Sequence, residues 1–422
     1  MLAILTACGR NSDNTVTHYA DERYELISLI LRLTREPFFS PTFSDFHQRL
    51  DYAFGRGPYL RHPIINLTRE NIISMNCALL LSINLQRDGE NFVFIESSSG
   101  IGNIGMLDAF GMLEAFDCPE MQARFLFYLN DFYREVNFGA FFRANYSYFA
   151  EHSHRLREEA LDDINFEWFE QFGLNPANMN VIISHSFLVH AGIAAWRHCE
   201  VTGETIIYAA IPPSHDYSRQ FVTIIHEFVH AFANYKAYDW LTENSEFYSL
   251  VAATYVSPYF LGYPNFDVIA GEYVTRAFTA LYLHENTERE LTNFFILDIV
   301  QGFLYSQEVF ALITDHEIVD LSVSSVLGIY EYSLGEEHSL FIMDWDGPTL
   351  VRWQFLDVKV ENQILDGLAG FAMRTEFGTE TGQILYVTWG NANFVYVDIG
   401  SAEDLNIPAG PGTRLYFKMP RF

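Results

Sequence analysis

The chain has 422 residues, more than one ordinary domain holds, and its 49% hydrophobic and 19% charged content excludes intrinsic disorder. Its formal net charge of −29 argues against nucleic acid and acidic membrane surfaces as partners, because both require a basic face. The cysteines are too few and too scattered for a disulfide scaffold or a thiolate zinc site: Cys8, Cys77, Cys118 and Cys199.

The N-terminal segment resembles the signal of a bacterial lipoprotein. Leu5-Thr-Ala-Cys8 is similar to a lipobox, although no basic stretch precedes it, and the polar run from Gly9 to Asn14 is typical of a flexible tether. The resemblance implies a protein that is exported and lipid-anchored through Cys8 to the bacterial cell envelope. No other segment is long and apolar enough to span a bilayer. We expect residues 1–20 to be a truncated signal and tether; the alternative is an ordinary apolar N-terminus with a buried cysteine.

The next part of the chain predicts mainly helices. Apolar residues at helical spacing indicate helices over 21–35, 69–85, 119–137, 146–171, 218–235, 246–253, 271–283 and 291–303. Two short runs rich in β-branched residues, Asn180–Ser184 and Glu204–Ile211, predict strands. Residues 21–312 are therefore expected to form a mainly helical domain with a small β-sheet.

The pattern changes after about residue 314. Short apolar runs separated by turn residues predict strands over 321–327, 339–345, 350–358, 370–377, 384–389, 394–399 and 413–419. We expect residues 313–422 to form a small, all-β, sandwich-like domain. The fold class predicted for the whole chain is α+β.

The most informative motif is His226-Glu227-Phe228-Val229-His230, inside the most regular predicted helix. Residues four apart on a helix lie about 40° apart around its axis, so both imidazoles can reach one zinc ion. Glu227 lies about 60° beyond His230, where it can reach a zinc-bound water without being a ligand. Zinc lowers the pKa of such a water, and Glu227 would act as the general base. The alternative is a structural pair of core histidines.

A third protein ligand would complete the site. Position 236 is a lysine, which excludes the metzincin arrangement with a third histidine six residues after His230. Glu272 opens the predicted helix 271–283, and a carboxylate on an apolar helix face needs a reason such as a metal. Glu246 is the competing candidate. Without a metal, Glu272 would favour the helix N-terminus or pair with Arg276, which could also orient it as a ligand.

These residues resemble those of the gluzincin metallopeptidases. The pattern His226-Glu-Phe-x-His-x-Phe-x-Asn234, with Glu272-x-x-x-Arg-Ala277, is similar to an uncharacterised family of gluzincin-like bacterial lipoproteins over about residues 21–310. The resemblance implies zinc on two histidines and a glutamate, and a sheet strand that lines the cleft. Glu204–Ile211 is our candidate for that strand, where an extended peptide could pair. Tyr273 and Asn234 are candidate oxyanion donors.

We therefore expect a zinc-dependent metallopeptidase acting on a peptide or protein substrate. Two alternatives stay open: a surface-anchored binding lipoprotein with a non-catalytic zinc site, and a zinc hydrolase that acts on a non-peptide amide or ester. The sequence does not specify the oligomeric state or the cleavage preference.

Overall fold

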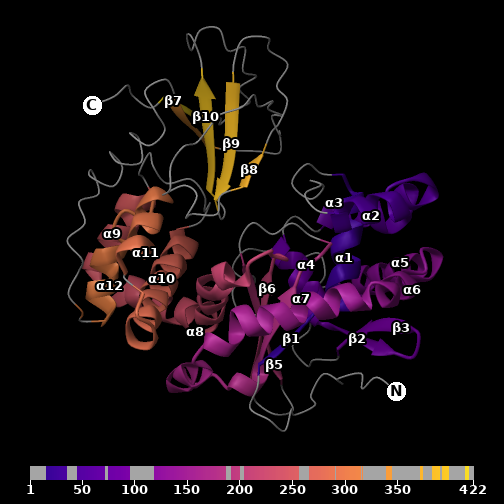
Figure 1. The fold of residues 1–422 in the computed structure, drawn as a ribbon, viewed down its shortest axis with the longest axis horizontal. Helices are drawn as coiled ribbons and strands as arrows, with labels where there is room; N and C mark the ends of the chain where they lie inside the picture. Colours follow the sequence, from indigo (N-terminus) through magenta and orange to yellow (C-terminus); the bar gives the residue numbers. More distant parts are fainter. Residues whose placement is uncertain are drawn as a thin grey trace. The chain divides into compact units, whose positions relative to one another are not determined.

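The computed structural model of the protein (Figure 1) describes residues 16–35, 45–71, 75–95, 118–186, 192–199, 204–255, 266–289, 291–314, 316, 339–344, 371–373, 383–389, 392–398 and 414–417. The predicted lipid-anchor residue Cys8 lies outside these ranges. The chain divides into two compact units, residues 1–231 and 232–422, and the division falls inside the helix α8 (Phe221–Glu243).

Helix α1 (Glu22–Leu33) lies in the core of the first unit. Asp21 caps it, because its side chain accepts hydrogen bonds from the backbone N–H groups of Arg23 and Tyr24. Two acids in the first turn and Arg32 in the last turn suit the helix dipole. Ten of its residues are buried, so it packs on several sides, against α3 (Pro63–Asn71), α4 (Met75–Ile83) and α6 (Phe138–Ala144).

Further helices and one hairpin complete the helical part of the first unit. Helices α5 and α7 pack next to the helices around α1, since α5 packs on α3 and α6, and α6 packs on α7. The hairpin packs on α4 and α5. The bounds of these elements are α2 (Asp45–Phe54), α5 (Pro119–Glu135), α7 (Tyr146–Glu159), β2 (Leu85–Asp88) and β3 (Asn91–Phe94).

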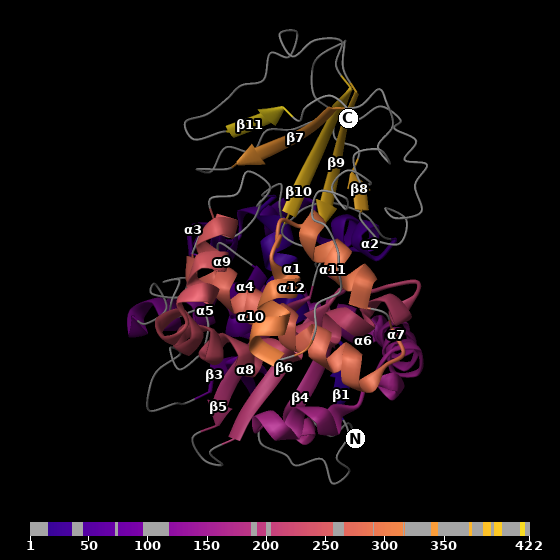
Figure 2. The same ribbon diagram turned by 90° about the vertical axis from the view of Figure 1, so that its left-hand side faces the viewer.

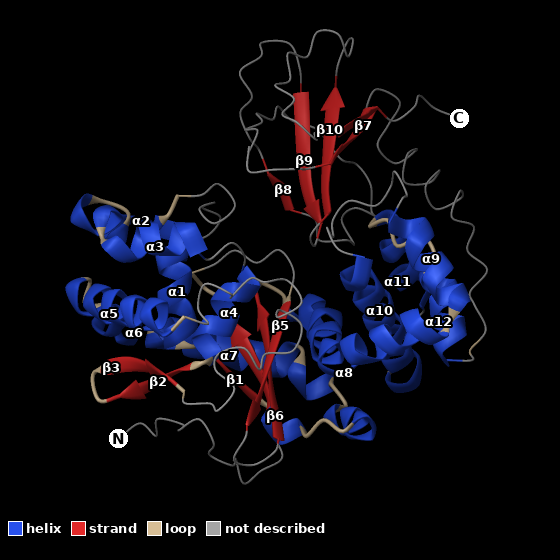
Figure 3. Cartoon of the chain, turned by 180° about the vertical axis from the view of Figure 1, so that it is seen from behind, coloured by secondary structure: helices blue, strands red, loops and turns tan. Residues whose placement is uncertain are grey.

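The first unit contains a mixed four-stranded sheet (Figure 3) of β1 (Thr17–Tyr19), β4 (Met179–Ile183), β6 (Glu204–Ile211) and β5 (Ile193–Cys199), in that spatial order. Strands β1, β4 and β6 are parallel, and β5 runs antiparallel to β6. Helix α4 packs against β5 and α7 against β1. The expectation that Glu204–Ile211 accepts a peptide is wrong, because β6 is already paired on both sides. The edge strands among the described residues are β1 and β5.

The helices of the second unit are arranged around α10 (Phe266–Asn286), as Figure 2 shows. Helix α10 is buried along most of its length and packs against α9 (Ser245–Tyr255), α11 (Leu291–Val300) and α12 (Ser306–Thr314). It begins one turn earlier than the predicted 271–283, a difference that bears on the site below.

The strands after residue 338 form one antiparallel sheet in the described part of this region, in the order β11-β7-β10-β9-β8. Their bounds are β7 (Ser339–Asp344), β8 (Phe371–Met373), β9 (Gln383–Trp389), β10 (Ala392–Asp398) and β11 (Arg414–Phe417). The predicted strands over 321–327 and 350–358 lie outside the described residues. The sandwich-like domain and the bounds 21–312 and 313–422 stay predictions.

In the described residues, the predicted α+β class is confirmed at the level of a mostly helical fold with a small mixed sheet. The predicted helices over 69–85 and 146–171 differ most from the structure. The region 69–85 holds parts of α3 and α4, and α7 ends at Glu159, after which short 3-10 helices follow as far as Phe172. Within the described ranges, no helix combines the length and the apolar character that crossing a membrane requires.

Candidate metal centre

Helix α8 presents the two motif histidines side by side. Ile224, Ile225, Phe228 and Val229 are all fully buried around the motif, so this part of the helix is fixed by packing rather than by its own propensity. The His226 and His230 rings lie one turn apart with centroids separated by 4.7 Å. His230 is 4% exposed, and His226 is partly accessible. Two imidazoles placed side by side, one buried and one partly accessible, are suited to a shared cation.

Glu272 of α10 joins this pair. One ligand atom of each of His226, His230 and Glu272 lies within 4.8 Å of the others. Because α10 begins at Phe266, Glu272 lies inside the helix, and a charge preference for the helix N-terminus does not explain it. The competing Glu246 is an exposed residue in the first turn of α9 and is not in this group. Two imidazoles and one carboxylate are the donor set of a catalytic zinc with an open fourth position.

Close packing of α8 on α10 sets the spacing in the second unit. The Phe232 and Phe278 ring centroids are 5.2 Å apart, and the Lys236 ammonium lies 4.9 Å from the Phe278 ring centroid. The position that a Cβ on Gly271 would occupy is 2.8 Å from Asn234 Oδ1. A side chain at position 271 would therefore displace the Asn234 amide, which lies against the α10 backbone. This packing gives no support to the predicted oxyanion role of Asn234.

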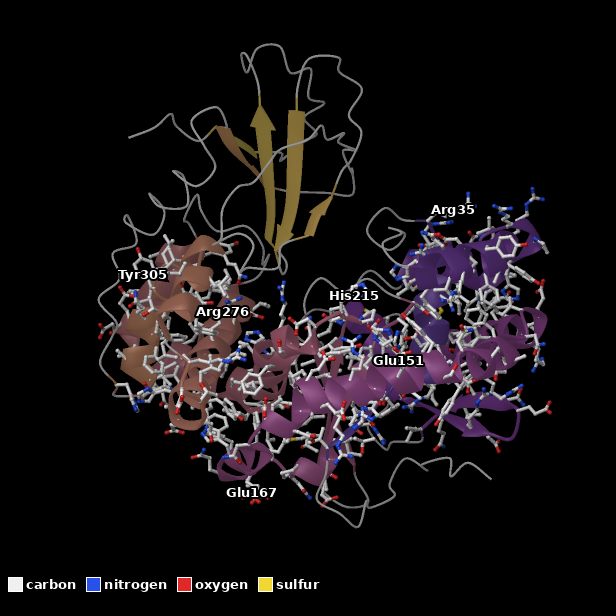
Figure 4. The ribbon with its side chains drawn as sticks, viewed as in Figure 1. Arg35, Glu151, Glu167, His215, Arg276 and Tyr305 are labelled. Atoms are coloured by element: carbon white, nitrogen blue, oxygen red, sulfur yellow. The ribbon has the colours of Figure 1, made fainter. Side chains whose placement is uncertain are left out.

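Arg276 contacts Glu272 from within α10. Its Nε lies 3.7 Å from Glu272 Oε2, one turn away. Its Nη1 donates to Asp298 Oδ1 of α11, and its Nη2 donates to Gln301 Oε1 at 2.8 Å. The guanidinium carbon lies 4.0 Å from the Phe303 ring centroid. Arg276 is thus held on several sides within the helices of the second unit (Figure 4), as suits a residue that orients a ligand.

The main chain at the start of β5 passes directly against Glu227. A Cβ on Gly192 would lie 2.5 Å from Glu227 Cγ, 2.6 Å from Glu227 Oε1 and 2.7 Å from Thr223 Cγ2. Glu227 is 5% exposed. Sequence reasoning missed Gly192, because a single glycine before a short apolar run carries no sign of its tertiary neighbour. The edge strand therefore begins at the acid expected to act as the base.

Tyr273 has a structural environment. Its hydroxyl hydrogen-bonds with Thr254 Oγ1 and accepts a hydrogen bond from the Tyr305 backbone N–H at 3.3 Å. The side chain is fully buried, and this desolvation raises the pKa of the Tyr273 hydroxyl. The predicted oxyanion role therefore has no support, and Tyr273 connects α9 and α10 to the segment before α12.

A second group of metal-ligand type, His62, Asp131 and Glu135, has a simpler explanation. The Ile64 backbone N–H donates to His62 Nδ1 at 3.2 Å, which places the proton of a neutral ring on Nε2. That nitrogen lies 3.4 Å from Asp131 Oδ2 and 3.7 Å from Glu135 Oε2. With Nε2 as a donor it has no lone pair for a metal, and both carboxylates are exposed. His62 thus caps the start of α3 and contacts two acids of α5, and this group is not a metal site.

Comparison with protein-family models, with curated proteins and with solved structures finds no match for this chain.

Proposed function

We propose that this protein is a zinc-dependent hydrolase of the gluzincin type and that it cleaves peptides. The observation that carries the proposal is the group of His226, His230 and Glu272, whose ligand atoms lie within 4.8 Å of one another, with Glu227 in the same helical turn as the histidines. The donor set matches zinc, since imidazole nitrogens and a carboxylate are its usual ligands at catalytic sites. Glu227 is the proposed general base.

Zinc, when bound, supplies Lewis acidity and brings the pKa of a coordinated water towards neutrality. The residues of this chain provide the rest of the chemistry. The Glu227 carboxylate takes a proton from the attacking water and delivers it to the leaving nitrogen. Glu227 is buried and Gly192 lies against it, which keeps the carboxylate close to one geometry.

A peptide is favoured over a small ester because an edge strand begins at the site. Strand β5 is seven residues long and pairs, among the described residues, with β6 alone. Its first residue follows Gly192, which lies against Glu227. An extended peptide can add to such an edge through main-chain hydrogen bonds and place a peptide bond near the carboxylate. Strand β1, the other edge, has only three residues.

The test combines metal analysis with cleavage of a peptide library. The wild type is expected to hold one zinc and to cleave. Glu227→Gln is expected to keep the zinc and to lose cleavage, whereas His230→Ala loses both. Glu246→Gln is the matched control, since it removes an exposed acid close in sequence, and it should behave as the wild type does. Equal cleavage by the wild type and Glu227→Gln would refute the mechanism. Ester turnover without peptide cleavage would refute the substrate class.

We further propose that the protein acts at the bacterial cell envelope, attached by a lipid on Cys8. The support is the lipobox resemblance of Leu5-Thr-Ala-Cys8. Metabolic labelling with a fatty acid is expected to mark the wild type in a bacterial host. Labelling of a Cys8→Ser variant at the same level would contradict the anchor.

A further inference from the structure

We propose that Asp298 is a positioning residue for the metal centre, which holds Arg276 so that Glu272 is oriented but stays available as a ligand. This inference rests on the proposed zinc function. It concerns a residue on a different helix from the motif.

The contacts connect α11 through Arg276 to Glu272, the proposed metal ligand. Asp298 is 1% exposed and accepts from Arg276 Nη1, while Gln301 accepts from Nη2. Both terminal nitrogens of the guanidinium are thereby directed at α11 and the residue after it. Only Nε faces Glu272, at 3.7 Å, which is longer than a hydrogen bond. The guanidinium of Arg276 thus lies beside the Glu272 carboxylate without forming a bidentate pair with it.

Charge explains why this arrangement matters. The two carboxylates and one guanidinium carry a formal charge of −1 and are nearly buried, with side-chain exposures of 8% for Glu272, 12% for Arg276 and 1% for Asp298. A zinc ion on Glu272 would be attracted by the net charge of these three groups.

Removal of the Asp298 charge is expected to change the partner of Arg276. A guanidinium released from α11 can turn its two terminal nitrogens to the Glu272 carboxylate and form the bidentate pair that arginine favours. That pair would neutralise the ligand and compete with zinc. Asp298 therefore acts through Arg276 and does not touch the metal or the substrate.

The experiment measures zinc affinity by competition with a chromogenic chelator, using the full chain. Asp298→Asn is expected to bind zinc about 10- to 100-fold more weakly than the wild type, the usual effect of losing an outer partner of a metal ligand. The electronic spectrum of the cobalt-loaded variant should differ from that of the wild type. Glu288→Gln, which removes one exposed acid from the same unit, is the control with unchanged affinity.

A double-mutant cycle separates positioning from general loss of structure. In the Arg276→Gln background, Asp298→Asn should not weaken zinc binding further, because its route to Glu272 is already gone. Gln301→Ala, which removes the other partner of the terminal nitrogens without a charge change, should shift the affinity in the same direction. If Asp298→Asn does not fold, the zinc affinity of Gln301→Ala tests the same role.

The outcomes are distinguishable. Wild-type zinc affinity in a folded Asp298→Asn, or additive losses in the cycle, would overturn the role of Asp298 and leave the proposed hydrolase intact. A wild-type protein that binds no zinc would overturn both.

Discussion

Substitution of Gly192 by alanine tests the link between the edge strand and Glu227. The added methyl group would lie 2.5 Å from Glu227 Cγ, so one of the two must move by roughly 0.9 Å to reach ordinary contact at 3.4 Å. The neighbouring Thr223 Cγ2, at 2.7 Å, restricts movement on one side. Overpacking of this kind costs about 1–3 kcal/mol of stability. A displacement of about 1 Å at a catalytic group costs about 100-fold in rate.

We therefore expect Gly192→Ala to lower kcat about 100-fold while the zinc content stays at the wild-type level. The assay measures kcat and KM on a cleaved peptide, the zinc content and the melting temperature. In the Glu227→Gln background the same substitution should have no further effect on kcat, because the displaced carboxylate is already absent. A Gly192→Ala variant with wild-type kcat would show that the strand does not constrain Glu227. Loss of zinc together with activity would show that the damage is not local.

Three further predictions address the metal, the fold and its pH dependence. Zinc at about 100 times its dissociation constant should stabilise the wild type by about 2.7 kcal/mol and leave His230→Ala unchanged, as thermal unfolding with and without zinc will show. Asp21→Ala removes the cap of α1 and the ion pair with Arg23, and should lower the free energy of unfolding by more than the about 1 kcal/mol of a cap alone, with the exposed Glu70→Ala as control. Burial lowers the pKa of His47 to about 4, so the folded state binds fewer protons than the unfolded state. The stability that neutral His47 contributes above pH 6.5 is therefore lost as the pH falls through 4. Urea unfolding should show that the free energy of unfolding lost between pH 7 and pH 4 is about 3 kcal/mol smaller in His47→Gln than in the wild type. Equal losses in the two proteins would contradict this.

Local periodicity was sufficient to predict the central helix and the motif within it. The stripe of Phe221, Ile225, Phe228 and Phe232 placed His226 and His230 on one helix, and all four aromatic or aliphatic residues are buried. An acid in an apolar helix, which is a local signal as well, favours Glu272 over Glu246 as the third ligand. The structure brings Glu272 to the histidines, although the role of all three as zinc ligands stays a prediction.

The features that the sequence could not provide are pairings between distant segments. Strand β5 was missed because its Ala194-Ala-Trp-Arg run has little of the β-branched character that marks β4 and β6. For the same reason the edge was assigned to the wrong strand, since strand order depends on partners and not on composition. Asp298 carries the same local signal as Glu272, an acid in an apolar helix, but its role depends on its contact with Arg276, which the sequence does not show.

The position of β5 at the border of its sheet has a consequence for which proteins would be attacked. Amide groups are the same in every polypeptide, so recognition through them discriminates by conformation more than by side-chain identity. A segment that is already helical, or that is paired on both sides in another sheet, has no unpaired main-chain amide groups that could bind to β5. If the proposed function holds, folded compact proteins resist cleavage, whereas unfolded chains and long surface loops are cleaved.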